Sequence, residues 1–535
     1  MVVGLFRNKN RQGYALKTSY ALSEAMPDFS QVPLVSRLDD NVRLLQSVLA
    51  RSADVVMTPF ILYDKRAAKL IYIEGLSSSS EIDANLLQPL IKGSNGKFDE
   101  REKNVSIERL AKEYITISEW KLIHTIGELV EDLMEQHVIL LIDGQTRGLA
   151  LSLVSRRDRS IGIPDTEALI RGPRESFNEN IATSISLIRR RLPTPHLKVE
   201  SKRLGEYTRT DVCVLYIEGI VDMNLVAEMN ERLNRIKIDG ILDSAYIEEL
   251  IEDEPYSPFP QIQNTERPDV AVSGLLEGKV VILSDGSPFA LVAPTSFWTA
   301  IHAAEDHYER YFIVNFIRIL RYLFLFFALF LPAMYVAITT FHQEMLPTRL
   351  LLTFAAAREV TPLPAIMEAI VMEITFEILR EAGVRLPKAI GSAVSIVGAL
   401  VIGQAAVQAG MASAPMVIVV ALTGIASFSI PRYNFATAIR ILRFPIIILA
   451  GTFGMFGIIA ALLAITIHLA SLRSFGKPYM EPISPLSMQG VKDTLIRMPR
   501  WGMKYRPLSE SKVNPVRQSG ATRPSNRIPK RGGGS

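Results

Sequence analysis

The sequence has almost no cysteine and no recognisable catalytic pattern. It has one cysteine among 535 residues, Cys213, which lies in an apolar strand-like run, so disulfides play no part. No nucleophile–base signature appears, so no enzyme activity and no catalytic residue are predicted. His302 and His307 are five residues apart and do not share a helix face, so no metal site and no cofactor are predicted.

Several larger features are lacking as well. The formal net charge is only +4, and no basic face is interleaved with aromatic residues, so no nucleic-acid partner is predicted. The first residues contain no uninterrupted apolar core of a signal peptide, so we expect the region that follows to stay on the cytoplasmic side. The GSNGK phrase at 93–97 lacks the spacing of a phosphate-binding loop and predicts a polar loop.

Charge is distributed very unevenly along the chain. Residues 1–310 carry dense mixed charge, whereas four apolar stretches are almost free of it and are long enough to cross a membrane as helices: 319–340, 389–410, 413–431 and 444–472. The predicted fold class is an α+β/α multi-domain membrane protein, with two tandem α/β cytoplasmic subdomains followed by an all-α transmembrane domain. The expected divisions are an N-terminal extension (1–35), the subdomains (36–160 and 161–305), a helical membrane domain (306–472), and a basic cytoplasmic tail (473–535) that is disordered from 508 onward.

The soluble part contains an internal duplication. KLIYIEG at 69–75 is echoed by CVLYIEG at 213–219 with an offset of 144, and HVILLIDG at 137–144 is echoed by KVVILSDG at 279–286 with an offset of 142. Each phrase predicts a buried strand, and each Asp-Gly pair predicts a hairpin turn. An arginine run at 189–191 follows one of the expected helices; it either mediates subunit contacts or is a solvated helix end.

Two of the apolar stretches have features of their own. In 389–410, small residues recur every fourth position and predict close packing against another helix: Gly391, Ser395, Ala399 and Gly403. Gln404 and Gln408 share a face there; they either hydrogen-bond across helices or line a pathway. The stretch 444–472 is long for one span and is either tilted or broken at Gly451, Gly454 or Gly457.

The segment 346–388 alternates apolar turns with charges. After Pro362 and Pro364 we expect a helix over about 365–382 that carries four acidic residues: Glu368, Glu373, Glu377 and Glu381. The last three fall on one stripe, and each carboxylate facing lipid would cost at least about 2.5–3.5 kcal/mol. The stripe is therefore expected to face water. The helix either lies at the membrane surface, with Arg380 neutralising part of the stripe, or lines a pore, where a ring of carboxylates would favour cations.

The positive charges constrain the topology. The tail from Arg473 onward holds 13 Lys/Arg and three acids, which favours the cytoplasmic side. Arg432, Arg440 and Arg443 favour the same side, and both conditions cannot be met if 445–472 crosses once. We expect an even number of crossings, with these three arginines within protein or at an interface.

Several long phrases of the sequence resemble one family in the same order. They are PDTEALIRGPRESFNENIATSISLIRRRL (164–192), QIQNTERPDVAVSGLLEGKVVILSDGSPFALVAPTSF (261–297), LPTRLLLTFAAAREVTPLPAIMEAIVMEITFEILREAGVRLPKAIGSAVSIVGALVIGQAAV (346–407) and IHLASLRSFG (467–476). From about residue 36 to 507 the chain resembles the A subunits of GerA-type spore germinant receptors of endospore-forming bacteria. The family usually has a small residue near Val360 and Thr361, where this chain departs from it.

The resemblance implies a role in spore germination at the inner spore membrane, with the N-terminal domain and the tail on the cytoplasmic (core) side. It implies a homo-oligomer, expected as a pentamer, that forms a nutrient-gated channel for monovalent cations. The implied partners are a transporter-like B subunit, a lipoprotein C subunit and membrane lipid. The residues expected to line the pore are Glu373, Glu377, Glu381 and Glu368, with Val360 as an apolar constriction. The alternatives are a non-conducting scaffold, a nutrient transporter, and a sporulation-stage paralogue that amplifies ion release.

Overall fold

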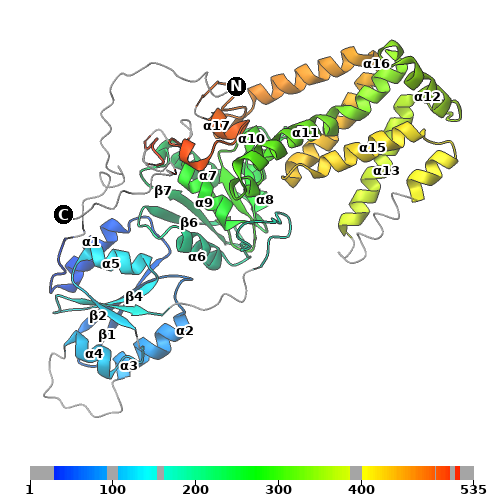
Figure 1. The fold of residues 1–535 in the computed structure, drawn as a ribbon. Helices are drawn as coiled ribbons and strands as arrows, with labels where there is room; N and C mark the ends of the chain where they lie inside the picture. The colour runs from blue at the N-terminus through cyan, green and yellow to red at the C-terminus, as the bar shows by residue number, and fades with distance from the viewer. Residues whose placement is uncertain are drawn as a thin grey trace, which may run out of the picture.

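The computed structural model consists of two α/β subdomains followed by an elongated helical region (Figure 1). It describes residues 29–92, 106–153, 162–385, 401–506, 513–518 and 524, apart from positions 30, 118 and 489. The GSNGK loop, the boundary expected at 160/161 and most of the N-terminal extension lie outside the described residues.

The first subdomain is a five-stranded antiparallel sheet covered on both faces. Its strand order is β1-β2-β4-β5-β3, with β1 Val55–Ile61, β2 Ala67–Ile73, β3 Trp120–Ile123, β4 His137–Ile142 and β5 Gly148–Ser152. One apolar core lies under α1 (Leu38–Val48) and α5 (Ile126–Met134). The opposite core lies under α2 (Ser79–Ile82), η1 (Asp83–Leu87), α3 (Gln88–Lys92) and α4 (Ile107–Glu113).

The second subdomain repeats this arrangement. Its strand order is β6-β7-β9-β10-β8, with β6 Leu197–Leu204, β7 Thr210–Ile217, β8 Gln263–Thr265, β9 Val280–Ser284 and β10 Ala290–Ala293. One face packs against α6 (Ile181–Arg191) and α9 (Pro268–Glu277), and the other against α7 (Met223–Arg235) and α8 (Ser244–Ile251). The short helices α10 (Phe297–Ile301) and η3 (Ala304–His307) lead into the helical region.

The duplicated phrases occupy equivalent places in the two sheets, so the prediction of tandem α/β subdomains is confirmed. The first phrase forms β2 and β7, and the second forms β4 and β9. The Asp-Gly pairs close the β4–β5 and β9–β10 hairpins, with both glycines at positive φ. Asp143 accepts a hydrogen bond from the backbone N–H of Leu38 at 3.0 Å, and Asp285 accepts one from Ile181 at 3.1 Å. Each aspartate therefore also holds the first turn of the helix that begins its copy.

A buried ion pair joins the two subdomains. Arg189 on α6 donates two hydrogen bonds to Asp54, at 2.7 and 2.9 Å, and both residues are at least 96% buried. Backbone pairing between Ser52 and Val199 runs beside it. Arg189 is therefore neither solvated nor a subunit contact in this structure; it lies between the two subdomains of one chain.

The helical region has helices at the predicted apolar stretches that the structure describes, but two of these helices begin earlier than predicted, at residues 311 and 433. It contains α11 (Tyr311–Thr340), η4 (Gln343–Met345), α12 (Thr348–Glu359), α13 (Ala365–Arg385), α15 (Ala414–Phe428) and α16 (Tyr433–Ser471). By length and composition, α11 and α16 are able to cross a membrane, and α15 is a shorter apolar helix. Most of the expected span 389–410 lies outside the described residues, including Gly391, Ser395 and Ala399. Its end, 401–408, is helical.

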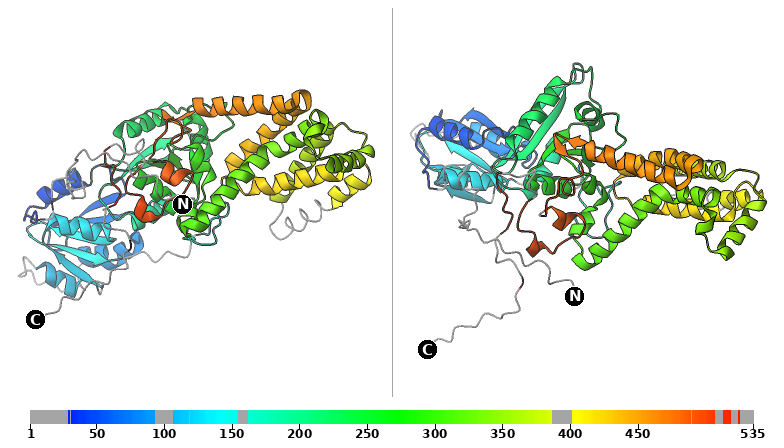
Figure 2. Two further views of the ribbon diagram at one scale, coloured as in Figure 1. Left: turned by 45° about the horizontal axis from the view of Figure 1, so that its top comes forward. Right: turned by 90° about the horizontal axis from the view of Figure 1, so that it is seen from above.

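Helix α16 reverses direction at Gly454. A straight helix of 39 residues would be about 58 Å long, twice a membrane core. Gly454 instead has φ 62° and ψ −140°, which is not helical, and the chain turns back there beside Phe341 and His342 at the end of α11. Both ends of α16 meet the same side chain, since the ring of Phe259 lies 5.9 Å from that of Phe435 and 6.1 Å from that of His468. The two antiparallel halves are visible in Figure 2.

Because α16 reverses, the two positively charged segments, 432–443 and the tail, can lie on the same side of a membrane. The connection at 432–443 and the described part of the tail up to 506 both lie at the end of the helical region that contacts the second subdomain (Figures 1 and 2). The tail forms β11 (Arg473–Ser474), β12 (Lys477–Pro478), α17 (Val491–Thr494) and η5 (Arg500–Gly502). Residues 513–518 differ from the disorder expected after 508, because the guanidinium of Arg506 donates to the backbone oxygens of Asn514 and Val516.

The Arg189–Asp54 pair gives a testable prediction for the soluble part. Replacing Asp54 with Ala leaves a buried guanidinium without its counter-charge, which should lower the free energy of unfolding by about 3–5 kcal/mol. Asp211→Ala is the matched control, because the Arg203–Asp211 pair is exposed and should contribute about 1 kcal/mol or less. Denaturant unfolding of the full chain, followed by circular dichroism, measures both. Equal effects of the two substitutions would contradict a structural role for the buried pair.

Candidate functional site

Helix α13 carries the predicted acidic residues and contacts α11, α15 and α16. Close approach is possible because glycines face it: a Cβ at Gly424 of α15 would lie 2.3 Å from Phe376, and one at Gly451 of α16 would lie 2.4 Å from Ile366. The acidic side chains of α13 are thereby brought among neighbouring helices. Their surroundings differ from one residue to the next.

Glu373 is fully buried and forms an ion pair with Arg443 of α16. The Nη1 of Arg443 lies 2.5 Å from a carboxylate oxygen of Glu373, and its Nε donates to the backbone oxygen of Ala328 on α11 at 2.8 Å. One guanidinium therefore joins three helices. Glu373 was expected to face water, but in the structure it faces Arg443. The ion pair compensates the carboxylate for its withdrawal from water.

Glu377 lies one turn further along and contacts two arginines. Arg380 of the same helix approaches to 2.6 Å, and Arg440 of α16 to 3.6 Å. Arg432, at the start of α16, pairs with Glu167 of the second subdomain. The three arginines of 432–443 were predicted to lie within protein or at an interface. Arg440 and Arg443 are at most 5% exposed, and the side chain of Arg432 is 13% exposed, in agreement with that prediction.

Glu368 is buried at the N-terminus of α15. One of its carboxylate oxygens accepts hydrogen bonds from the backbone N–H and from the hydroxyl of Ser413, both at 2.6 Å. Ser413 is the N-cap of α15, and the hydroxyl of Tyr335 on α11 lies 3.2 Å from its side chain. A carboxylate at this place compensates the positive end of the helix dipole.

The remaining predicted residues are exposed. Glu381 pairs with Arg385, one turn along α13, and both side chains are more than half exposed. Val360 is the C-cap residue after α12 and is 74% exposed. Gln404 and Gln408 are exposed as well, and Gly403 is close enough to Val417 for an added Cβ to make an ordinary contact of 3.5 Å. The pore-lining assignments of all five predicted residues stay predictions, since one chain contains no subunit axis.

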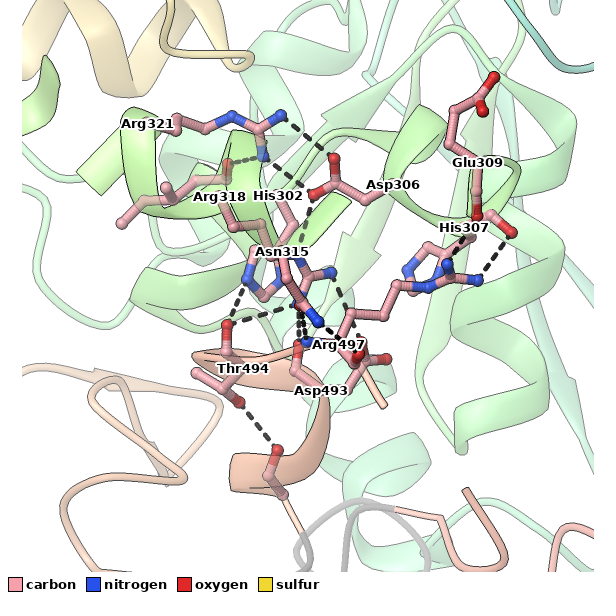
Figure 3. Close-up of polar contacts among 12 residues, drawn as sticks. His302, Asp306, His307, Glu309, Asn315, Arg318, Arg321, Asp493, Thr494 and Arg497 are labelled. Atoms are coloured by element: carbon pink, nitrogen blue, oxygen red, sulfur yellow. Dashed lines mark hydrogen bonds and ion pairs between the residues drawn. The ribbon is translucent and has the colours of Figure 1, made fainter. Parts of the chain in front are cut away.

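A second polar cluster joins the base of α11 to the tail (Figure 3). Asp306 of η3 is buried and accepts hydrogen bonds from Arg318 at 3.1 Å and from Arg321 at 2.9 and 3.1 Å. Arg318 also donates to the backbone oxygen of Asp493 on α17 at 2.5 Å. Because α11 is the first helix of the helical region, this cluster fixes where that region starts relative to the soluble part.

The tail side of the cluster is bound mainly through backbone atoms. The imidazole Nε2 of His302 lies 2.9 Å from the backbone oxygen of Thr494, which can only accept, so Nε2–H donates. Arg497 donates to the backbone oxygens of Glu309 and His307, at 2.8 and 3.1 Å, and its own N–H donates to Asn315 at 2.7 Å. Sequence spacing gave no signal for this cluster, since its members lie up to 195 residues apart.

Burial decides the protonation of the two histidines. Withdrawal from water, followed by repulsion from Arg318, lowers the pKa of His302 to about 3. Burial and repulsion from Arg500 lower the pKa of His307 to about 4. Burial raises the pKa of Asp306, but the hydrogen bonds and charges of the arginines outweigh it, so the net shift is downward. At neutral pH both imidazoles are therefore neutral, and Asp306 is ionised.

The Glu373–Arg443 pair predicts a large effect in the helical region. Arg443→Met leaves Glu373 buried and unpaired, which should destabilise the protein by about 3–5 kcal/mol, whereas the double variant Glu373→Leu/Arg443→Met should recover most of that loss. Glu381→Gln, in an exposed pair one turn apart, should change stability by about 0.5 kcal/mol or less. Thermal unfolding in detergent micelles measures all three. A double variant as unstable as Arg443→Met would argue against the pair.

The histidines predict a loss of stability in acid. Because the pKa of His302 is lower when folded than the usual 6.5, the unfolded chain takes up the proton first. This contribution is complete above about pH 6.5 and is lost as the pH falls toward 3, so about 2 kcal/mol of stability should have been lost at pH 5. His302→Gln should reduce the drop in melting temperature between pH 7 and pH 5, whereas His124→Gln, an exposed histidine, should not. The same drop in both variants would contradict the assignment.

Known proteins are similar to this chain over most of its length. The family model described as "Bacillus/Clostridium GerA spore germination protein" matches residues 43–509. Spore germination protein KA of Bacillus subtilis (strain 168) is 45% identical over 490 residues, covering 91% of this chain and 89% of that protein. The uncharacterized membrane protein YfkQ of the same organism is 45% identical over 502 residues, covering 94% and 96%.

Among solved structures, the N-terminal domain of the A subunit of the Bacillus megaterium spore germinant receptor GerK3 is 36% identical. The match covers 50% of this chain and 97% of that one, with a TM-score of 0.40. The matched family consists of germination receptors, in agreement with the prediction that the chain is not an enzyme. Helices α11 and α16 are long and apolar enough to cross a membrane, as expected of a membrane protein. The chain belongs to the GerA family of Bacillus and Clostridium spore germination proteins, the A subunits of germinant receptors.

Proposed function

We propose that this chain forms a ring of identical subunits, expected as a pentamer, which opens a path for monovalent cations across the inner spore membrane when a nutrient is sensed. The transporter-like B subunit senses the nutrient, and the lipoprotein C subunit completes the receptor. The soluble subdomains and the tail lie on the cytoplasmic (core) side. The reversal of α16 at Gly454 supports this orientation, because it brings the basic tail and the 432–443 connection to one end of the helical region.

The observation that carries the proposal is the uncovered surface of α12 and α13. No residue of α12 is buried in the single chain. On α13, Val371, Ile374 and Ile378 are exposed at helical spacing, and Glu381 continues the same stripe. A carboxylate at the end of an apolar stripe is unfavourable against lipid and favourable where identical subunits meet around water. Val360, exposed at the break between α12 and α13, would form the apolar constriction.

The structure changes which carboxylates are expected to face the ions. Glu373 and Glu368 are both fully buried, one paired with Arg443 and the other bound to Ser413. We assign these two a role in holding α13 against its neighbours in the closed state. Glu381 and, in part, Glu377 then provide the ring of charge. An open state that exposed Glu373 would have to separate it from Arg443.

A second candidate is a non-conducting scaffold that holds the partner subunits. The neutralised pairs favour it, because carboxylates bound to arginines contribute little net field to a passing cation. The two candidates differ in whether purified receptor conducts. Reconstitution of the chain in liposomes, alone and with the B and C subunits, separates them.

The channel proposal predicts a change in ion selectivity. Glu381→Gln should reduce the preference for K⁺ over Cl⁻ and lower K⁺ flux by several-fold, because the ring would lose one charge per subunit. Glu231→Gln is the matched control: Glu231 forms the same exposed one-turn pair, with Arg235, in the soluble part. Potassium efflux from liposomes and reversal potentials in planar bilayers measure both properties. If flux and selectivity are unchanged in Glu381→Gln and Glu377→Gln alike, these side chains do not line the path.

A further inference from the structure

The turn between α5 and β4 in the first subdomain brings three metal-ligating side chains together. Asp132 lies in the last turn of α5, Glu135 follows the helix, and His137 begins β4. One ligand atom from each lies within 4.8 Å of the others. The chain reverses between Glu135 and His137 because Gln136 has a positive φ of 75°. The three residues lie on both sides of a helix end and a strand start, so no single helical or strand period groups all of them.

Asp132 is a buried carboxylate that lacks a full set of partners. The residue is 3% exposed, and its Oδ1 lies 3.1 Å from the ammonium of Lys121. Its Oδ2 is buried and has no hydrogen-bond partner among the described residues. An unpartnered buried carboxylate oxygen is costly, and a bound cation would compensate it. The side chain of Lys121 is 60% exposed, so its ammonium is free to move into solvent when another cation arrives.

The imidazole of His137 is held in one tautomer. Its Nδ1 lies 3.1 Å from the backbone oxygen of Asp132. A carbonyl oxygen can only accept, so Nδ1 carries the proton, and the lone pair of the neutral ring is on Nε2. Histidines that bind metals commonly donate their other ring N–H to a backbone carbonyl in this way, because the hydrogen bond fixes both the tautomer and the ring orientation.

The duplicated subdomain provides an internal comparison. At the offset of 142, Gly274, Glu277 and Lys279 stand in place of Asp132, Glu135 and His137. There Lys279 lies 3.7 Å from Glu277, so a lysine supplies the positive charge. The fold of the repeat therefore does not require a buried aspartate or a histidine at this turn. The first copy has three metal-ligating side chains at this turn, whereas the second copy has the ammonium of Lys279 there.

We propose that Asp132, Glu135 and His137 bind one divalent transition-metal ion of the Zn²⁺ type. Two carboxylates and one neutral imidazole form a donor set that suits such ions, and the set contains no thiolate. Glu135 is exposed, so the coordination positions that the protein leaves open face solvent and take water. With three ligands at the junction of α5 and β4, the ion fixes the helix end against the sheet.

The test uses the purified full chain in detergent micelles, with affinity tags removed, and ZnCl₂ as the probe. Titration calorimetry should give one site per chain. Glu135→Gln and His137→Gln should each weaken Zn²⁺ binding at least about 10-fold, whereas His124→Gln, an exposed histidine of the same subdomain, should bind as the parent does. X-ray absorption of the Zn²⁺-loaded chain should show only nitrogen and oxygen ligands at about 2.0–2.2 Å.

Glu135→Gln keeps the test independent of folding, because Glu135 is exposed and its replacement leaves the buried contacts intact; circular dichroism checks this. Equal Zn²⁺ affinity in the parent, Glu135→Gln and His137→Gln would overturn the proposal. So would a sulfur ligand in the absorption spectrum, or no bound Zn²⁺ at millimolar ZnCl₂.

Discussion

The buried pair of Glu373 and Arg443 is the interaction on which the helical region depends. A helix with four carboxylates is a poor membrane segment by itself, and α13 is tolerated among apolar helices because two of its acids are compensated within the chain. Arg443 also donates to the backbone of α11, so the same guanidinium determines how α11, α13 and α16 pack. The carboxylate of Glu373 was expected to contact water, but it instead joins α13 to a neighbouring helix through Arg443.

Much of the architecture could be predicted because it follows from local patterns. The strands at 69–75 and 213–219 and their Asp-Gly hairpins are short-range features, and the repeat made them visible twice. The partners of Glu373 and Glu377 could not be predicted from periodicity, which reports the face of a helix but not what lies opposite. A signal was present nonetheless: Arg440 and Arg443 are one turn apart, as are Glu373 and Glu377, so two matching charged faces were available for pairing.

The soluble part and the helical region are connected at several points rather than by a linker. Asp54 and Arg189 join the two subdomains, and Asp306 with its two arginines joins the second subdomain to α11 and the tail (Figure 3). Buried ion pairs have strict geometric requirements, so they favour discrete arrangements over gradual deformation. A signal received on one part of this chain would therefore pass to the others as a change of packing, with each pair either kept or broken.

The turn at Gly454 has a mechanical consequence. Because the chain turns back there, the helical region begins and ends beside the second subdomain. Phe259 of that subdomain contacts both ends of α16. The tail contacts the base of α11 through Arg318. Both ends of α16 therefore lie beside the second subdomain. The distal turn, where His342 lies beside Gly454, is therefore connected to the second subdomain through helices on both sides of the turn.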